Sequence, residues 1–148
     1  MIQFKPLAHS DIDTIVDLMQ QFYAIDNYPI DIKISKSLFI EFLANEKLGN
    51  AWLILSENEI IGYVILTYIF SFEYQGKIAF LDELYLTEKA RGKGVGSKSI
   101  AFVLEESKKK ELKLIYLEIE NHNQNAQKLY LASGFELHNR KLMAYKTR

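Results

Sequence analysis

Hydrophobic residues recur at two spacings along this chain, and each spacing predicts a different kind of element. Apolar positions three and four residues apart predict helices over residues 11–23 and 35–45, from the glycine-rich segment to about residue 110, and over 123–133. Continuous runs rich in β-branched and aromatic residues predict strands. We expect these strands at residues 2–5, 51–56, 60–70, 77–86, 112–119, 135–137 and 141–145.

The order of these elements predicts the fold class. Residues 57–59 carry turn chemistry between two adjacent strands, which is typical of an antiparallel hairpin. Later, a strand, a helix and another strand follow one another, and such a crossover implies one parallel strand pair. We therefore expect an α/β fold with a mixed, mostly antiparallel sheet flanked by helices. With no visible linker or repeat, residues 1–148 form one domain in this interpretation.

Charge and hydropathy limit the classes of partner that we expect. The chain has 18 basic and 19 acidic residues, so it lacks the basic excess expected for binding nucleic acid or an anionic membrane. The lysine run at residues 108–110 falls at a predicted helix end, where cations favour the dipole. No apolar run reaches the roughly 18 residues that a membrane span needs. We expect a soluble cytoplasmic protein, and a homodimer is left open.

Cysteine is absent, which excludes disulfides, thiolate metal sites and a cysteine-linked acyl intermediate. The histidines at positions 9, 122 and 138 are scattered without metal-ligand spacing, so we expect no metal site.

The glycine-rich segment at residues 91–97 is the strongest chemical signal. Its glycines alternate with other residues behind a leading arginine, directly after a predicted strand and before a helix. Backbone N–H groups that no side chain covers, together with the positive end of a helix dipole, suit an anion and above all a phosphate. The segment comprises Arg91, Gly92, Lys93, Gly94, Val95, Gly96 and Ser97.

Several phosphate sites, and one plain alternative, compete for this segment. A Walker P-loop requires glycine where Ser97 stands, and it also needs a later strand ending in aspartate. A dinucleotide fingerprint has the spacing G-x-G-x-x-G, whereas this chain has G-x-G-x-G. An ordinary strand-to-helix connection needs one glycine rather than three, since each glycine loses extra backbone entropy on folding. The pattern Arg-x-x-Gly-x-Gly, typical of an acyl-coenzyme A pyrophosphate cradle, is satisfied by Arg91, Gly94 and Gly96.

A second motif strengthens this last interpretation. The spacing Asn-x-x-Ala-x-x-x-Tyr-x-x-x-Gly-Phe runs from Asn123 to Phe135. Together the two motifs resemble the GNAT superfamily of acyl-CoA-dependent N-acetyltransferases, and the element order agrees over essentially the whole chain. The resemblance implies a GNAT-like sheet whose parallel pair splays apart, acetyl-CoA as co-substrate, and acyltransferase activity. Because there is no cysteine, we expect direct transfer to a primary amine in a ternary complex.

The resemblance also implies roles for individual residues. The pantetheine arm would bind the backbone of Leu84, Tyr85 and Leu86, and the pyrophosphate would bind residues 91–97. Asn123 would cap its helix or bond the pantetheine. Tyr130 would contact the cofactor and protonate the departing thiolate, since a phenol with a pKa near 10 is a fitting donor.

Three carboxylates are candidates for removing the proton from the amine: Asp82, Glu83 and Glu118. Asp82 and Glu83 are consecutive in a strand, so we expect their side chains to point to opposite faces. A carboxylate in an apolar cleft has a raised pKa, which suits a general base near neutral pH. The sequence does not rank the three.

The acceptor is expected at acidic and aromatic segments, because carboxylates and aromatic faces attract a cationic amine. The candidates for substrate binding are Tyr23, Asp26, Tyr28 and Glu73. They favour a small amine, a polyamine or an aminoglycoside-like acceptor. The alternatives are a protein N-terminal or lysine acetyltransferase, and a non-catalytic acyl-CoA sensor.

Overall fold

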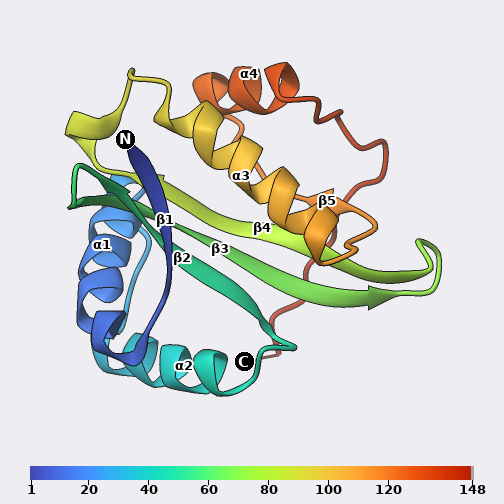
Figure 1. The fold of residues 1–148 in the computed structure, drawn as a ribbon. Coiled ribbons are helices and arrows are strands. Elements are labelled where there is room, and N and C mark those ends of the chain that lie inside the picture. The colour runs from blue at the N-terminus through green and yellow to red at the C-terminus, as the bar shows by residue number, and fades with distance from the viewer. Residues whose placement is uncertain (148) are drawn as a thin grey trace. The chain divides into compact units, whose positions relative to one another are not determined.

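The computed structural model describes residues 1–147, which form two compact units, residues 1–118 and residues 119–147. Figure 1 shows the ribbon, and each unit is described by itself. The elements of the first unit are β1 (Ile2–Pro6), the 3₁₀ turn η1 (His9–Asp11), α1 (Ile12–Ile25), α2 (Ile32–Ala44), β2 (Gly49–Ser56), β3 (Glu59–Ser71), β4 (Gly76–Leu86), the 3₁₀ turn η2 (Glu88–Ala90), α3 (Val95–Lys109) and β5 (Ile115–Tyr116).

One sheet organises the first unit. Its strand order is β1-β2-β3-β4-β5; the first three pairings are antiparallel, and β4 pairs with β5 in parallel. Helices α1 and α2 lie on one side of the sheet and α3 on the other (Figure 1). The predicted fold class, a mixed and mostly antiparallel sheet with one parallel pair, is confirmed.

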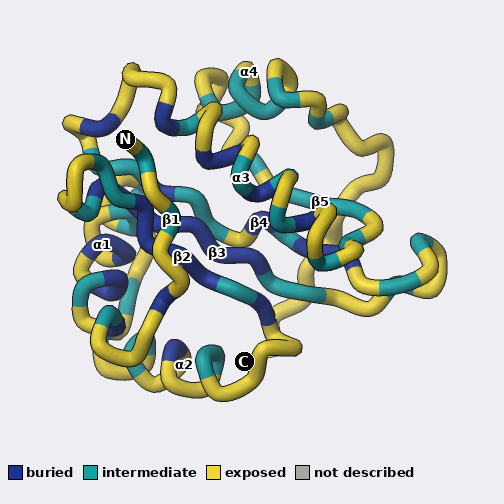
Figure 2. The backbone as a smooth tube through the Cα atoms, in the orientation of Figure 1, coloured by how far each residue is buried: buried dark blue, intermediate teal, exposed yellow. Residues whose placement is uncertain are grey.

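Side chains alternate between two hydrophobic layers, as the pleat of a strand requires. On the α1 side, Leu53, Tyr63 and Ile65 pack with Ile15 and Val16, all 5% exposed or less. The other layer is smaller and combines Ile54 and Ile61 of the sheet with Ala90 and Val95. Figure 2 shows the buried positions concentrated along the central strands.

Two boundaries differ from the sequence prediction for local reasons. Helix α2 begins earlier than expected because the Asp31 carboxylate accepts a hydrogen bond from the Ile34 backbone N–H at 2.9 Å and caps the helix. Strand β5 is shorter than the predicted strand at 112–119, because its pairing with β4 is limited to Ala79–Ile115 and Phe80–Tyr116. Beyond Phe80, β4 continues beside β3 while the β5 pairing has ended, which is the expected separation of the parallel pair.

Strand β4 contains a β-bulge that the sequence did not indicate. Ile65 of β3 lies opposite Glu83, and the next residue, Leu66, lies opposite Leu81. Asp82 is therefore an extra residue on β4, and such an insertion locally changes where the side chains point.

The second unit contains α4 (Gln124–Ala132), whose first turn is capped by the Asn123 side chain. The Phe135 N–H donates to the Tyr130 carbonyl, and the rings of these two residues meet edge to face at 5.6 Å. The strands predicted at 135–137 and 141–145 are wrong, since residues 135–147 contain no strand. Side chains in these runs, such as Leu137 and Leu142, are exposed, so no packing supports their β-propensity.

None of the helices formed by residues 1–147 combines the length and the apolar character needed to cross a membrane.

The close approach of β3 and β4 at Gly62 yields a stability prediction. A Cβ at this position would lie 2.1 Å from the Tyr85 carbonyl oxygen, so the strands would have to move apart. We expect Gly62→Ala to lower the free energy of unfolding by about 1–3 kcal/mol or more, measured by urea denaturation. A Cβ at Gly94 would meet nothing within 4 Å, so Gly94→Ala serves as the control and loses only about 1–2 kcal/mol through its left-handed backbone. Equal stability of Gly62→Ala and the wild type would contradict the packing described.

Candidate active site

Glu83 is held by two tyrosine hydroxyls that come from different elements. The Tyr23 hydroxyl of α1 donates to one carboxylate oxygen at 2.6 Å, and the Tyr63 hydroxyl of β3 donates to the other at 2.7 Å. Tyr63 is fully buried at the centre of the sheet, so one of the two donors is fixed by the core. The carboxylate is thereby positioned as a hydrogen-bond acceptor at both oxygens.

Opposing effects act on the pKa of Glu83. Burial raises the pKa of Glu83, and the charge of Asp82 raises it further, while the hydrogen bonds from Tyr23 and Tyr63 lower it. Burial, together with the interaction with Glu83, raises the pKa of both tyrosines. The tyrosines therefore remain protonated donors, and Glu83 titrates closer to neutrality than an ordinary glutamate.

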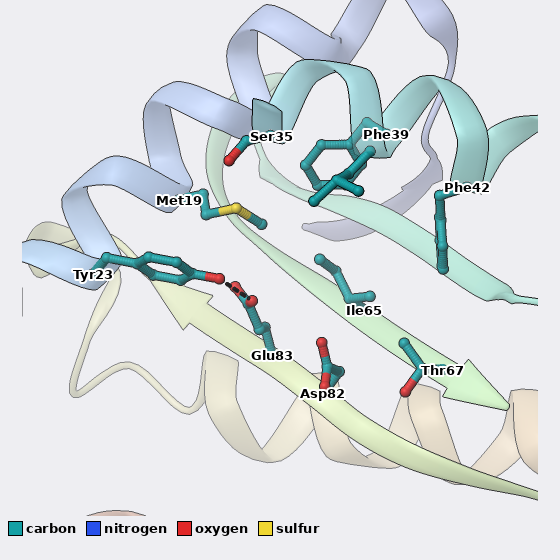
Figure 3. A pocket seen from close by; sticks show the side chains of 10 residues that line it. Met19, Tyr23, Ser35, Phe39, Phe42, Ile65, Thr67, Asp82 and Glu83 are labelled. Carbon is teal, nitrogen blue, oxygen red and sulfur yellow. Dashed lines mark hydrogen bonds between the residues drawn. The ribbon is translucent and has the colours of Figure 1, made fainter. Parts of the chain in front are cut away.

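A cavity of about 240 Å³ lies between β3, β4 and the two N-terminal helices, with Glu83 in its wall (Figure 3). Half of its lining is apolar, and its acidic groups come from β4 alone. The lining residues are Met19, Tyr23, Ser35, Leu38, Phe39, Phe42, Ile65, Thr67, Asp82 and Glu83.

Asp82 and Glu83 both line this cavity, and Figure 3 shows both side chains on the same side of β4. The expectation that they point to opposite faces is wrong. The physical reason is the β-bulge, because Asp82 is the extra residue and the simple alternation of a regular strand fails there. Two consecutive carboxylates consequently share one cavity.

Asp82 differs from Glu83 in its surroundings. Its side chain is partly exposed, and its apolar surroundings together with the charge of Glu118 raise its pKa. Glu118 is exposed at the last position of the first unit. All three carboxylates predicted from the sequence are therefore electrostatically connected, since Glu118 acts on Asp82 and Asp82 acts on Glu83.

The glycine-rich segment has the predicted strand-to-helix form. Gly92 and Gly94 adopt left-handed backbone angles, φ +76° and +77°, and a Cβ on either would meet nothing within 4 Å. Helix α3 begins at Val95 without a side-chain cap, and the Lys98 N–H donates to the Gly94 carbonyl at 3.2 Å. Gly96 thus belongs to the first helical turn, whose N–H groups have no partner within the helix. Open backbone, a helix N-terminus and the exposed Lys93 suit an anionic group.

The residues around the start of this turn already interact with other parts of the protein. The Arg91 Nε donates to the Leu86 carbonyl at 3.1 Å, and its guanidinium lies 5.9 Å from the centre of the Tyr85 ring. Tyr85 is buried in the core, whereas the neighbouring Leu84 packs against the opposite layer. Residues 84–86 lie beyond the part of β4 that pairs with β5. The family resemblance implies that the pantetheine arm binds along this edge of β4.

Of the four predicted acceptor residues, the structure brings only Tyr23 to the cavity; Asp26, Tyr28 and Glu73 do not line it. The sequence analysis missed the lining residues that α2 contributes, and also missed those of α1 and β3 other than Tyr23. The apolar residues of α2 have the spacing that is typical of a helix packed on a core. The one signal of a second role was that α2 carries more apolar residues than one packed face needs, and Ile34, Leu38 and Ile40 are more than half exposed. The missed residues are Met19, Ser35, Leu38, Phe39, Phe42, Tyr63, Ile65 and Thr67.

Asn123 and Tyr130 both lie in the second unit. The Asn123 side chain accepts from the Ala126 N–H at 3.0 Å, which confirms it as a helix cap. Burial raises the pKa of Tyr130, so its phenol stays protonated. Their roles toward a cofactor stay predictions.

Within residues 1–147 no group of three or more histidine, cysteine, aspartate or glutamate side chains is arranged to hold a metal ion.

The tyrosine pair around Glu83 can be tested by titration. Tyr23→Phe removes a donor that favours the charged carboxylate, so the pKa of Glu83 should rise further above its ordinary value. The measurement is a ¹³C NMR titration of the Glu83 carboxyl. Tyr145→Phe, at a tyrosine that is 90% exposed, is the matched control and should leave the titration unchanged. A fall or no change in Tyr23→Phe would show that the hydroxyl does not stabilise the charged form.

Comparison with known proteins adds independent information. Residues 13–135 match the family described as "Acetyltransferase (GNAT) family". The chain is 28% identical over 128 residues to the uncharacterized N-acetyltransferase YhfO of Bacillus subtilis, covering 86% of this chain and 85% of that protein. It is 26% identical over 138 residues to the D-amino-acid N-acetyltransferase HPA3 of Saccharomyces cerevisiae, covering 91% and 85%.

Solved structures share the same fold. The integron cassette protein HFX_CASS3, from the mobile metagenome of Cole Harbour Salt Marsh, superposes with a TM-score of 0.89 at 27% identity, over 99% of this chain and 91% of that one. An acetyltransferase from Clostridium acetobutylicum, solved with acetyl-CoA, superposes with a TM-score of 0.82 at 18% identity, over 98% and 96%. With a family match that covers most of its length, this chain belongs to the GNAT family of acetyltransferases.

Proposed function

We propose that this protein transfers an acetyl group from acetyl-CoA to a small primary amine by direct attack in a ternary complex. The observation that carries the proposal is the pair of carboxylates, Asp82 and Glu83, in one partly apolar cavity of a chain that belongs to an acetyltransferase family. Such a cavity can bind a cationic amine and also remove its proton.

The turn before α3 supports the proposal that acetyl-CoA is the acetyl donor. When bound, acetyl-CoA supplies a thioester whose acetyl group passes to a nitrogen nucleophile, with the thiol as leaving group. The left-handed Gly92 and Gly94 and the uncapped start of α3 fit its pyrophosphate, because they leave backbone N–H groups accessible. The backbone of 84–86 is the candidate for holding the pantetheine arm.

Glu83 is suited to binding the acceptor rather than to accepting the proton. Both of its oxygens already accept hydrogen bonds from the Tyr23 and Tyr63 hydroxyls, which hold the carboxylate in one position. Each carboxylate oxygen keeps further acceptor capacity, so an ammonium group can bind the same charge. In this proposal Glu83 binds the amine and orients it.

Asp82 is the preferred general base. The amine must lose a proton before its lone pair can attack, and a carboxylate with a raised pKa is a better acceptor near neutral pH. Glu118 keeps the pKa of Asp82 high through its charge and remains the alternative base, acting through water. Tyr130, whose raised pKa keeps its phenol protonated, is the proposed donor to the departing thiolate.

The charges of the residues that line the cavity favour one class of acceptor. The yeast relative is named for D-amino acids, which carry a carboxylate beside the amine. The cavity of this chain is lined by two carboxylates and, among the residues that the structure describes, by no basic side chain. A cationic amine without an anionic group fits it better, and acetylation of peptide N-termini is the competing outcome.

Donor binding can be tested at the glycine turn. Gly94→Ala places a methyl group over the open backbone, so acetyl-CoA should bind about tenfold more weakly by isothermal titration calorimetry. Gly76, at the start of β4, also has a positive φ, +150°, and a Cβ there would make only ordinary contact, at 3.4 Å with the Lys113 side chain. Gly76→Ala is therefore a control for backbone strain and should bind like the wild type. Unweakened binding by Gly94→Ala would contradict the proposed cradle.

The role of Asp82 can be tested by pH dependence. Glu118→Gln removes a negative charge that raises the pKa of Asp82, so that pKa should fall. The acidic limb of kcat/KM should then move to lower pH, measured by thiol release from acetyl-CoA with an accepted amine. Asp82→Asn should abolish most turnover while acetyl-CoA still binds.

An unmoved acidic limb in Glu118→Gln, or full activity in Asp82→Asn, would reject Asp82 as the base. Acetyl-CoA binding without thiol release from any amine or peptide would indicate a sensor module instead.

A further inference from the structure

The cavity that contains the two carboxylates has a polar and an apolar end. Asp82 and Glu83 project from β4, whereas Phe39 and Phe42 project from α2 toward them from the opposite side (Figure 3). Met19 of α1 completes the apolar wall. A ligand that spans this cavity therefore meets negative charge at one end and hydrocarbon at the other.

The volume limits what the apolar end can hold. An engineered apolar cavity of about 150 Å³ accommodates benzene, and a water molecule occupies about 30 Å³ of liquid. The observed 240 Å³ therefore leaves room for one ring and a few further heavy atoms.

The charges limit the acceptor further. A carboxylate on the ligand would lie near two like charges with no lysine, arginine or histidine from the described lining to pair with it. A second ammonium, as in a polyamine, would meet no acidic group among the α2 residues that line the cavity, and only the weaker cation–π attraction of Phe39 and Phe42. Both arguments leave a molecule with a single cation.

We infer that the acceptor is a small primary amine that carries one compact apolar group, about the size of a phenyl ring, and no carboxylate. This inference rests on the proposed acetyl transfer, and it makes the α2 face of the cavity the determinant of specificity. The aromatic side chains and the methionine sulfur on that face suit an aromatic ring.

Leu38 offers a test that does not depend on the core. It lines the cavity but is 57% exposed, so a polar replacement leaves the fold intact. It lies three residues after Ser35 and four before Phe42, on the same side of α2. Ile40 is 52% exposed on the same helix and does not line the cavity, so it gives a matched control.

The experiment compares 2-phenylethylamine, phenylalanine, ethylamine and spermidine, each by calorimetric binding and by thiol release from acetyl-CoA. We expect 2-phenylethylamine to bind and react best, with phenylalanine weaker by about 100-fold because it differs only by the carboxylate. Leu38→Asn should raise KM for 2-phenylethylamine about tenfold and leave that for ethylamine unchanged, while Ile40→Asn should change neither.

The outcomes separate the inference from the proposed function. Turnover that prefers spermidine or phenylalanine, or equal effects of Leu38→Asn and Ile40→Asn, would overturn the acceptor class and keep acetyl transfer. Selective binding of 2-phenylethylamine without thiol release would support the ligand class and reject the transferase. Neither binding nor release with any of the four amines would overturn both.

Discussion

One irregularity of the backbone, the β-bulge at Asp82, determines the chemistry of the cavity. In a regular strand, two consecutive side chains face opposite sides of the sheet, and one of these carboxylates would lie on the α3 side. The extra residue between the pairs Ile65–Glu83 and Leu66–Leu81 brings both to the side of α1 and α2. The cavity consequently carries two negative charges on adjacent residues, which no regular strand could supply.

The surrounding residues give these two charges different roles. Glu83 lies deeper and is held by Tyr23 and the buried Tyr63, so its position depends on the packing of the sheet. Asp82 lies at a partly exposed position where the charge of Glu118 acts on it. In the proposed function, Glu83 is therefore the carboxylate that binds the amine, and Asp82 is the one that accepts its proton. Environment, rather than residue type, separates the two roles.

Much of the fold and the form of the glycine-rich turn could be predicted from the sequence, because both depend on local patterns. Apolar spacing located α1 and α3, and the alternating glycines located a turn in which Gly92 and Gly94 do adopt left-handed angles. The acceptor cavity could not be predicted, because it depends on contacts between distant residues. Tyr23 and Glu83 are 60 positions apart, and the bulge has no local signature in the chain. The two strands predicted at residues 135–137 and 141–145 did not form, because a short apolar run becomes a strand only when a neighbouring strand is available to pair with it.

The placement of both carboxylates in one cavity can be measured directly. The charge of Asp82 raises the pKa of Glu83, and this effect is stronger the closer together the two side chains lie. In Asp82→Asn, a ¹³C NMR titration of the Glu83 carboxyl should give a pKa below that of the wild type. An unchanged Glu83 pKa would mean that the two carboxylates do not interact, and it would contradict the bulge as the origin of the site.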